Sequence, residues 1–149
     1  MKTKETKNLE KALDALSKAK REYGCEEVTI GFKSSGHGDE IVDYMTMDAK
    51  GIFKCYELKV TLQDLKTDNK KSFYGDYNYL VLSSELYEKQ SLDKWKEELP
   101  PYVGILVIDP DISEKQCVKK PKKIEIHDAM KNILKDSLIR TLFYQKKKQ

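Results

Sequence analysis

The sequence predicts a single α/β domain built on a mixed β-sheet. Two observations lead to this fold class: an amphipathic helical pattern precedes three extended runs joined by short connections, and each later extended run follows a helical one. Strands joined by tight turns pair antiparallel, whereas strands joined through a helix pair in parallel, so the sheet should contain both arrangements. A length of 149 residues and an apolar content of 39% suit one domain with a sizeable core.

The chain opens with a pattern typical of an amphipathic helix. Leucine and alanine recur at three- and four-residue spacing across Asn8–Tyr23, and Gly24 should end the helix. The β-rich run Glu27–Lys33 then predicts a first strand, and Ser34–Gly38 predicts a flexible loop. In this loop lies His37, whose neutral imidazole could contact phosphate or transfer a proton, with an incidental loop histidine as the alternative.

A β-hairpin is predicted next. Two extended runs, Glu40–Met47 and Ile52–Val60, flank the tetrapeptide DAKG. Its aspartate and glycine are typical of a type I turn closed by a left-handed glycine, which predicts a three-residue loop with a bulge at Gly51. Counting back along both strands from this loop puts Asp43 directly opposite Glu57. We therefore expect two carboxylates on one face of the hairpin.

Lys59 adds an ammonium group to this face because it lies two residues beyond Glu57. Two adjacent carboxylates repel each other unless a cation or a shared proton lies between them, and hard oxygen ligands favour Mg²⁺ or Mn²⁺. A lysine beside such an ion can orient or help to deprotonate the attacking water, which is the chemistry of metal-assisted phosphodiester hydrolysis. Glu10 and Asp14 of the first helix could approach the same ion, although solvated side chains are the simpler expectation.

An ordinary solvated strand face is the alternative for these charges, since 36% of the residues are charged. Apolar residues of the same parity argue against it. Phe53 and Cys55 precede Glu57 on its face. Met45 lies two residues after Asp43 and therefore on the same face of its strand. Because a solvated face does not normally carry such residues, we favour a functional site.

The remaining elements follow from the same signals. Thr61–Asp64 has the form of a capping box and predicts a short helix. Helical spacing and apolar β-rich runs predict, in chain order, a strand at Tyr77–Ser83, a helix at Glu85–Glu98, a strand at Tyr102–Ile108, a short extended segment at Cys117–Ile126 and a helix from Asp128 to about Tyr144. No repeat or linker divides the chain, so residues 1–149 should form one domain, with residues 1–7 and 146–149 frayed.

The order helix, three strands, helix, strand, with Asp43 on the second strand and Glu57-Leu58-Lys59 on the third, resembles the PD-(D/E)xK nuclease superfamily. The stretches ELKVTLQDLKTDNK, YNYLVLS and PPYVGILVID and the basic C-terminal end are similar to its MmcB-like branch, which is linked to DNA repair. This likeness covers the chain from about Gly38 onward. It implies a restriction-endonuclease-like core (αβββαβ), with helices on both faces of a mixed sheet, plus an extra strand and a basic C-terminal helix.

The resemblance also implies a Mg²⁺- or Mn²⁺-dependent deoxyribonuclease acting in repair, recombination or mobile-element biology. By this likeness Asp43, Glu57 and the backbone carbonyl of Leu58 would hold the metal. Lys59 would be the catalytic lysine. Val42 stands where the superfamily often has a proline.

Positive charge is concentrated at the C-terminal end. Residues 115–149 carry 11 basic and 3 acidic side chains, a balance of +8, whereas residues 1–114 carry 17 basic and 22 acidic ones, a balance of −5. This asymmetry predicts a polyanionic partner, here DNA, although a solvated end that only aids solubility explains the last lysines equally well. The candidate nucleic-acid contacts are His37, Lys66, Lys70, Lys119, Lys120, Lys122 and Lys123.

Several classes of protein do not fit the sequence. No apolar run approaches the ~20 residues of a membrane span, and there is no apolar signal-peptide core. Cys25, Cys55 and Cys117 are too few and too scattered for a disulfide framework or a zinc site, so we expect free thiols in a cytoplasmic protein. Two functions stay open beside the nuclease: a catalytically inactive nucleic-acid-binding module of the same fold, and a protein-interaction or inhibitor protein. A homodimer or a protein partner is also open, because cutting both strands of DNA often needs a second subunit.

Overall fold

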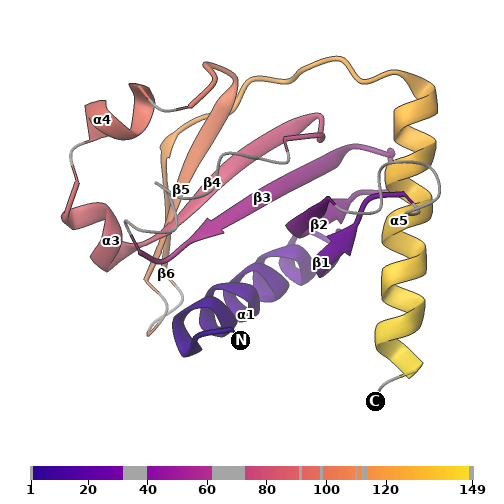
Figure 1. The fold of residues 1–149 in the computed structure, drawn as a ribbon, viewed down its shortest axis with the longest axis horizontal. Helices are drawn as coiled ribbons and strands as arrows, with labels where there is room; N and C mark the ends of the chain where they lie inside the picture. Colours follow the sequence, from indigo (N-terminus) through magenta and orange to yellow (C-terminus); the bar gives the residue numbers. More distant parts are fainter. Residues whose placement is uncertain are drawn as a thin grey trace.

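The computed structural model describes residues 2–31, 40–61, 73–90, 92–97, 99–109, 111 and 114–147. They form a six-stranded sheet whose strands lie side by side in chain order (Figure 1). The strands are β1 (Tyr23–Thr29), β2 (Ile41–Met47), β3 (Phe53–Lys59), β4 (Tyr77–Ser83), β5 (Val103–Asp109) and β6 (Glu114–Lys119). The helices are α1 (Lys4–Ala19), α3 (Ser84–Glu88), α4 (Leu92–Glu97) and α5 (Asp128–Lys147). The predicted α/β class is confirmed.

The sheet is mixed, as predicted. β1, β2 and β3 pair antiparallel, β3, β4 and β5 pair in parallel, and β6 returns antiparallel to β5. The change of direction follows from the connections, because a tight turn joins β2 to β3 whereas α3 and α4 lie between β4 and β5. The extra strand expected beyond the αβββαβ core is β5. A sixth strand, β6, begins before the predicted extended segment Cys117–Ile126 and occupies only its first part.

The β2–β3 hairpin has the predicted loop. Asp48 N donates to Ile52 O at 3.1 Å, and Gly51 has the left-handed φ of +78°. The Asp48 carboxylate closes the turn by accepting hydrogen bonds from Lys50 N at 2.9 Å and from Ile52 N at 3.0 Å. This loop sets the strand register on which the candidate site depends.

Helix α1 begins at Lys4, so the predicted start at Asn8 was wrong. Thr3 is the cap, and its hydroxyl accepts a hydrogen bond from Thr6 N at 3.2 Å. Residues 2–7, which we expected to fray, belong to this helix and its cap. Glu5 in the first turn adds a favourable interaction with the helix dipole.

Helix α1 also ends earlier than predicted. Arg21 adopts a left-handed conformation with φ +56°, and Glu22 N donates to Ser17 O at 2.9 Å, which closes the helix end. We expected Gly24 to end the helix, but Gly24 lies inside β1, where an added Cβ would lie 2.5 Å from the Tyr44 hydroxyl oxygen. The first strand therefore starts earlier than predicted, and glycine is required there by close packing.

Helices cover both faces of the sheet, α1 on one and α5 on the other (Figure 1). The α1-side core contains Leu9, Leu13, Tyr44, Tyr56, Leu58, Val81 and Ile108. The α5-side core contains Met45, Phe53, Cys55, Leu134 and Leu138, and farther along the same face Leu80, Leu82 and Ile105 pack with Leu86 of α3. Because neighbours in a strand point to opposite faces, the pairs Tyr44–Met45 and Cys55–Tyr56 separate the two cores.

Helix α5 protects the edge of the sheet at β1 (Figure 1). Arg140 Nη2 donates to Thr29 O at 3.0 Å and to Gly31 O at 2.6 Å, and Gln145 Nε2 donates to Glu26 O at 3.1 Å. Side chains of the helix thus take the place of a further strand along β1. This use of the basic C-terminal helix prevents pairing of β1 with another chain.

Two short helices, α3 and α4, take the place of the predicted helix Glu85–Glu98. Helix α3 ends because Lys89 caps it: the Lys89 N–H donates to Leu86 O at 3.2 Å. The predicted loop with His37 and the predicted helix that starts at Thr61, with Lys66 and Lys70, lie outside the described residues. None of the helices in the described part of the chain is long and apolar enough to cross a membrane.

Candidate functional site

Strands β2 and β3 separate at the predicted site, and we call the opening between them the fork. Among the described residues, the backbone ladder between β2 and β3 ends at the pair Tyr44–Tyr56. Beyond this pair β2 stays bonded to β1, and β3 stays bonded to β4. Asp43 is the first residue past the ladder on one branch, and Glu57 is the first on the other. The predicted register is thus confirmed as far as Tyr44 and Tyr56, and the expected pair Asp43–Glu57 lies one residue beyond it.

Asp43 reaches across this fork to β3. Its Oδ2 accepts a hydrogen bond from Leu58 N at 2.9 Å, so the carboxylate takes the place of a strand partner. In an extended strand the N–H and C=O of one residue point to the same neighbour, so the Leu58 carbonyl also faces the fork. Two of the three oxygen ligands that the resemblance implies therefore lie in this opening.

Strand alternation alone does not put Asp43 on the face of Glu57. Tyr44 packs in the α1-side core and Val42 in the α5-side core, although residues two apart in a regular strand share a face. The interruption coincides with Glu27 in β1, whose φ is +52°. Asp43 is therefore positioned by its hydrogen bond across the fork, which counting from the turn did not predict.

Glu57 and Lys59 are buried, with 3% and 5% of their surface exposed. They follow Phe53 and Cys55 along β3, and these two residues pack in the α5-side core. A carboxylate and an ammonium group buried on one strand are costly to desolvate and are not a solvated strand face. Burial therefore argues against the alternative of an incidental pair of surface charges.

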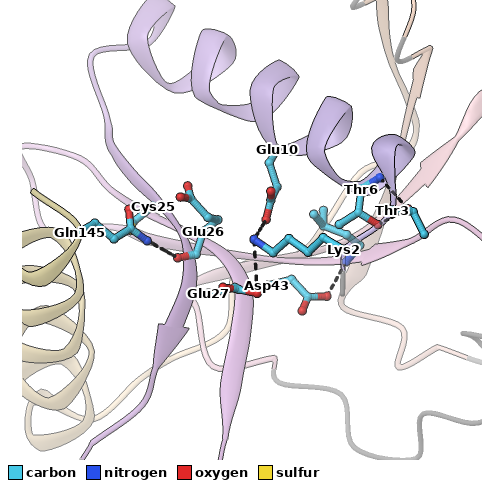
Figure 2. Close-up of polar contacts among 10 residues, drawn as sticks. Lys2, Thr3, Thr6, Glu10, Cys25, Glu26, Glu27, Asp43 and Gln145 are labelled. Atoms are coloured by element: carbon cyan, nitrogen blue, oxygen red, sulfur yellow. Dashed lines mark hydrogen bonds and ion pairs between the residues drawn. The ribbon is translucent and has the colours of Figure 1, made fainter. Parts of the chain in front are cut away.

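A second group of charges adjoins Asp43 (Figure 2). Lys2 Nζ lies 2.6 Å from Glu10 Oε2 of α1 and 3.3 Å from Glu27 Oε1 of β1. The β1–β2 register puts Glu27 opposite Asp43, and Figure 2 shows the two side chains next to each other. Lys2 thus offsets the negative charge that Glu10 and Glu27 bring to this side of the fork.

The pKa values of this group show the balance of burial and charge. Burial opposes the charge on Lys2, but the hydrogen bonds and charges of Glu10 and Glu27 outweigh it, so the pKa of Lys2 is raised. Burial raises the pKa of Glu10, and Lys2 offsets this effect only in part. The surroundings therefore favour the charged form of Lys2 and disfavour the charged form of Glu10.

Asp14, the other acid of α1 considered from the sequence, has a different partner. The Tyr44 hydroxyl donates a hydrogen bond to Asp14 Oδ1, and Ser17 Oγ lies 3.4 Å from the same hydroxyl. Burial and the Asp14 contact raise the pKa of Tyr44 well above its ordinary value. Asp14 therefore connects α1 to β2 through the Tyr44 hydroxyl, and this contact does not involve Asp43 or Glu57.

The candidate DNA-binding lysines at the end of β6 do not form one patch. Burial, then the charges of Lys96 and Lys122, lower the pKa of Lys119, so these three ammonium groups lie near one another on the α4 side. Lys120 lines a hollow on the opposite face of the sheet. Lys123 is exposed. The structure thus divides a sequence cluster between two surfaces.

The oxygen donors at the fork fit a magnesium or manganese ion. In the described part of the chain no three His, Cys, Asp or Glu side chains converge as a metal site. The expected set is smaller: two carboxylates, Asp43 and Glu57, and the Leu58 carbonyl. Mg²⁺ commonly takes one or two carboxylates and leaves its other positions to water and phosphate, so this donor set suffices.

Sequence reasoning missed two residues of this region, Lys2 and Glu27. Lys2 precedes the apolar stripe of α1 and carries no periodic signal. Glu27 was assigned to a strand without any indication of its left-handed backbone. Their approach to Asp43 depends on the packing of α1 against β1, which has no local signature in the sequence.

Comparison with known proteins shows the fold and nothing finer. No family model and no curated protein matches the chain. A solved structure, the SPO1766 protein of unknown function from Silicibacter pomeroyi, superposes with a TM-score of 0.75 at 16% identity and covers 97% of this chain and 90% of that one. The likeness therefore extends over the whole domain, and at this identity it supports the architecture alone.

Proposed function

We propose that this protein is a metal-dependent nuclease that hydrolyses phosphodiester bonds of DNA at the β2–β3 fork. The observation that supports the proposal best is the hydrogen bond of Asp43 to Leu58 N across the fork, next to the buried Glu57 and Lys59. It puts the Asp43 carboxylate beside the Leu58 backbone where the sheet opens, and Glu57 and Lys59 flank Leu58 along β3. The resemblance to PD-(D/E)xK nucleases, with its MmcB-like branch linked to DNA repair, agrees with this arrangement.

Each residue of the fork has a role in the proposal. Asp43, Glu57 and the Leu58 carbonyl would hold Mg²⁺ or Mn²⁺, which would activate water and neutralise charge on the phosphate. Lys59 would donate hydrogen bonds to the negative charge that develops on the phosphate oxygens. Because Lys59 is 5% exposed, its charge acts with little screening by water.

The test is cleavage of labelled single-stranded, nicked and branched DNA by the purified chain with Mg²⁺, with Mn²⁺ or with a chelator. We expect cleavage only with a metal ion, and its loss in Asp43→Asn and Glu57→Gln. Glu85→Gln is the matched control, because Glu85 lies on α3 with an exposed side chain. Circular dichroism should show all three variants folded. Cleavage in chelator, or wild-type rates in Glu57→Gln, would contradict the proposal.

A binding module without turnover is the second candidate. It is favoured by the fact that, in the described part of the chain, no three His, Cys, Asp or Glu side chains converge as a metal site. Isothermal titration with Mg²⁺ and Mn²⁺ separates the candidates: binding of metal and DNA without cleavage of any substrate would select the inactive module.

A further inference from the structure

We propose that the α1-side face of the sheet carries a second binding surface, which takes single-stranded nucleic acid. It goes beyond the proposed nuclease site and does not depend on it. The surface consists of two hollows of about 600 and 230 Å³ that share Tyr79 and Cys117. We call it the tyrosine groove; it runs from Lys20, just past α1, to Lys50 in the β2–β3 loop.

Aromatic rings line the groove. The Tyr79 ring stacks on the Tyr56 ring with centroids 5.0 Å apart and an interplanar angle of 9°. Tyr56 is buried, while Tyr79 and Tyr77 are half-buried and line the groove. Tyr56 lies beside Tyr79 on the neighbouring strand and packs against one face of its ring, so Tyr79 is held in a fixed orientation, as in the aromatic side chains on which unpaired bases stack.

The Tyr79 hydroxyl carries no negative charge under physiological conditions. Burial, together with the neighbouring Cys117, raises the pKa of Tyr79 to about 12. The ring is therefore neutral beside a phosphate backbone, and its hydroxyl can donate a hydrogen bond.

Lysines dominate the walls of the groove. Five lysines and one carboxylate, that of Asp48, line the two hollows. The Asp48 carboxylate is already engaged by Lys50 N and Ile52 N, and Lys54 pairs with Glu22 at 2.8 Å. The excess charge comes from Lys20, Lys50, Lys115 and Lys120, and it complements a polyanion.

A single strand fits these features better than a duplex. Stacked bases in a duplex present phosphates but no base faces, so a duplex would use the lysines and leave the tyrosines without a partner. The groove also lies on the face opposite Glu57, because Lys54 and Tyr56 alternate with Cys55 and Glu57 along β3. The tyrosine groove is therefore a binding surface separate from the fork.

The first experiment uses the intact chain in chelator, so that no cleavage can occur. Cys117 is exposed in the groove, whereas Cys25 and Cys55 are buried, so a thiol reagent reports on Cys117 in the native protein. A short oligothymidine or oligouridine should slow this labelling in proportion to its occupancy. A preference between them would identify DNA or RNA as the ligand.

The second experiment measures affinity by fluorescence anisotropy at several salt concentrations. Tyr79→Leu should weaken binding about fivefold to a hundredfold, the loss expected for one stacked base. The double variant Lys50→Gln/Lys120→Gln should reduce the salt slope by about 0.7 per lost phosphate contact. The matched controls are Tyr87→Leu on α3 and Lys89→Gln at its C-cap, and they should bind like the wild type.

Three results would overturn the proposal. One is Cys117 labelling that the oligonucleotides leave unchanged. Another is equal affinity for single strand and duplex. The last is protection of Cys117 by an acidic peptide such as polyglutamate but not by nucleic acid, which would assign the groove to an acidic protein. None of these results bears on metal-dependent cleavage at the fork, so the two proposals fail separately.

Discussion

Lys59 allows a prediction about the proposed chemistry at the scale of one residue. Its ammonium group cannot serve as a metal ligand, so its contribution should lie in the transition state. We expect Lys59→Met to bind Mg²⁺ within a few-fold of the wild type and to lose cleavage about 100-fold or more, the cost of one preorganised donor. Calorimetry gives the metal affinity, and single-turnover assays give the rate. The control is Lys89→Met, because Lys89 is an exposed lysine at the C-cap of α3. Wild-type cleavage by Lys59→Met would remove the lysine from the mechanism.

Lys2 and Glu10 allow a prediction about stability. Because Glu10 is 8% exposed, Lys2→Met should leave an uncompensated buried carboxylate and cost about 2 kcal/mol of unfolding free energy. The double variant Lys2→Met/Glu10→Gln should cost less, about 1 kcal/mol, because the charge is removed with its partner. Urea unfolding of both variants at neutral pH checks this. Additive losses would show that the two residues do not interact.

The raised pKa of Lys2 fixes how this contribution depends on pH. The ordinary pKa of a lysine side chain is 10.5, and the pKa of Lys2 in the folded protein lies above it. The stabilisation from the Lys2 charge is therefore complete below 10.5 and is lost as pH rises through the folded pKa. We expect the stability difference between wild type and Lys2→Met to shrink above pH 10.5. The ordinary pKa of a glutamate side chain is 4.5, and the pKa of Glu10 in the folded protein is higher. Ionisation of Glu10 therefore lowers the free energy of unfolding as pH rises above 4.5.

At the scale of elements, α5 closes the edge of the sheet through a few side chains. Arg140→Met removes the donors to Thr29 O and Gly31 O and should destabilise the protein by about 1–3 kcal/mol, because it leaves carbonyl groups without a donor. Hydrogen exchange should accelerate first in β1. Asp136→Asn breaks only the exposed ion pair of Arg140 and should change stability by less than about 0.5 kcal/mol. Equal exchange rates in wild type and Arg140→Met would show that the helix does not hold this edge.

At the scale of the whole molecule, the three cysteines differ in burial and in strand position: Cys117 is exposed, whereas Cys25 and Cys55 are buried, in β1 and β3 respectively. Burial, followed by the charges of Glu26 and Asp14, raises the pKa of Cys25 to about 12, and burial raises that of Cys55 further. In Cys117→Ser we expect almost no labelling of the native protein. As urea is added, Cys25 should react first, because it lies in the edge strand β1, and Cys55 should react only with global unfolding. Peptide mapping after pulse labelling identifies each thiol, and simultaneous labelling of both would show that β1 does not open on its own.

The sequence by itself determined the parts of the protein that depend on local chemistry. The DAKG turn specifies Gly51 and the hairpin register through hydrogen bonds within a few residues. Apolar runs predicted β4, and the spacing of apolar residues predicted α5, because burial of one face requires that periodicity. From this register the opposition of Asp43 and Glu57 could be counted. The metal, the cleavage of DNA and the role of Lys59 stay predictions.

Only the tertiary structure decided which groups meet at the fork and on the opposite face. The approach of Lys2 and Glu27 to Asp43 results from the packing of α1 on β1, and the division of Lys119 from Lys120 results from their lying on opposite faces of the sheet. The stack of Tyr79 on Tyr56 joins residues of two parallel strands. Such contacts connect residues far apart in the chain, and their free energy depends on solvent exclusion by the assembled layers, which no local pattern of residues encodes.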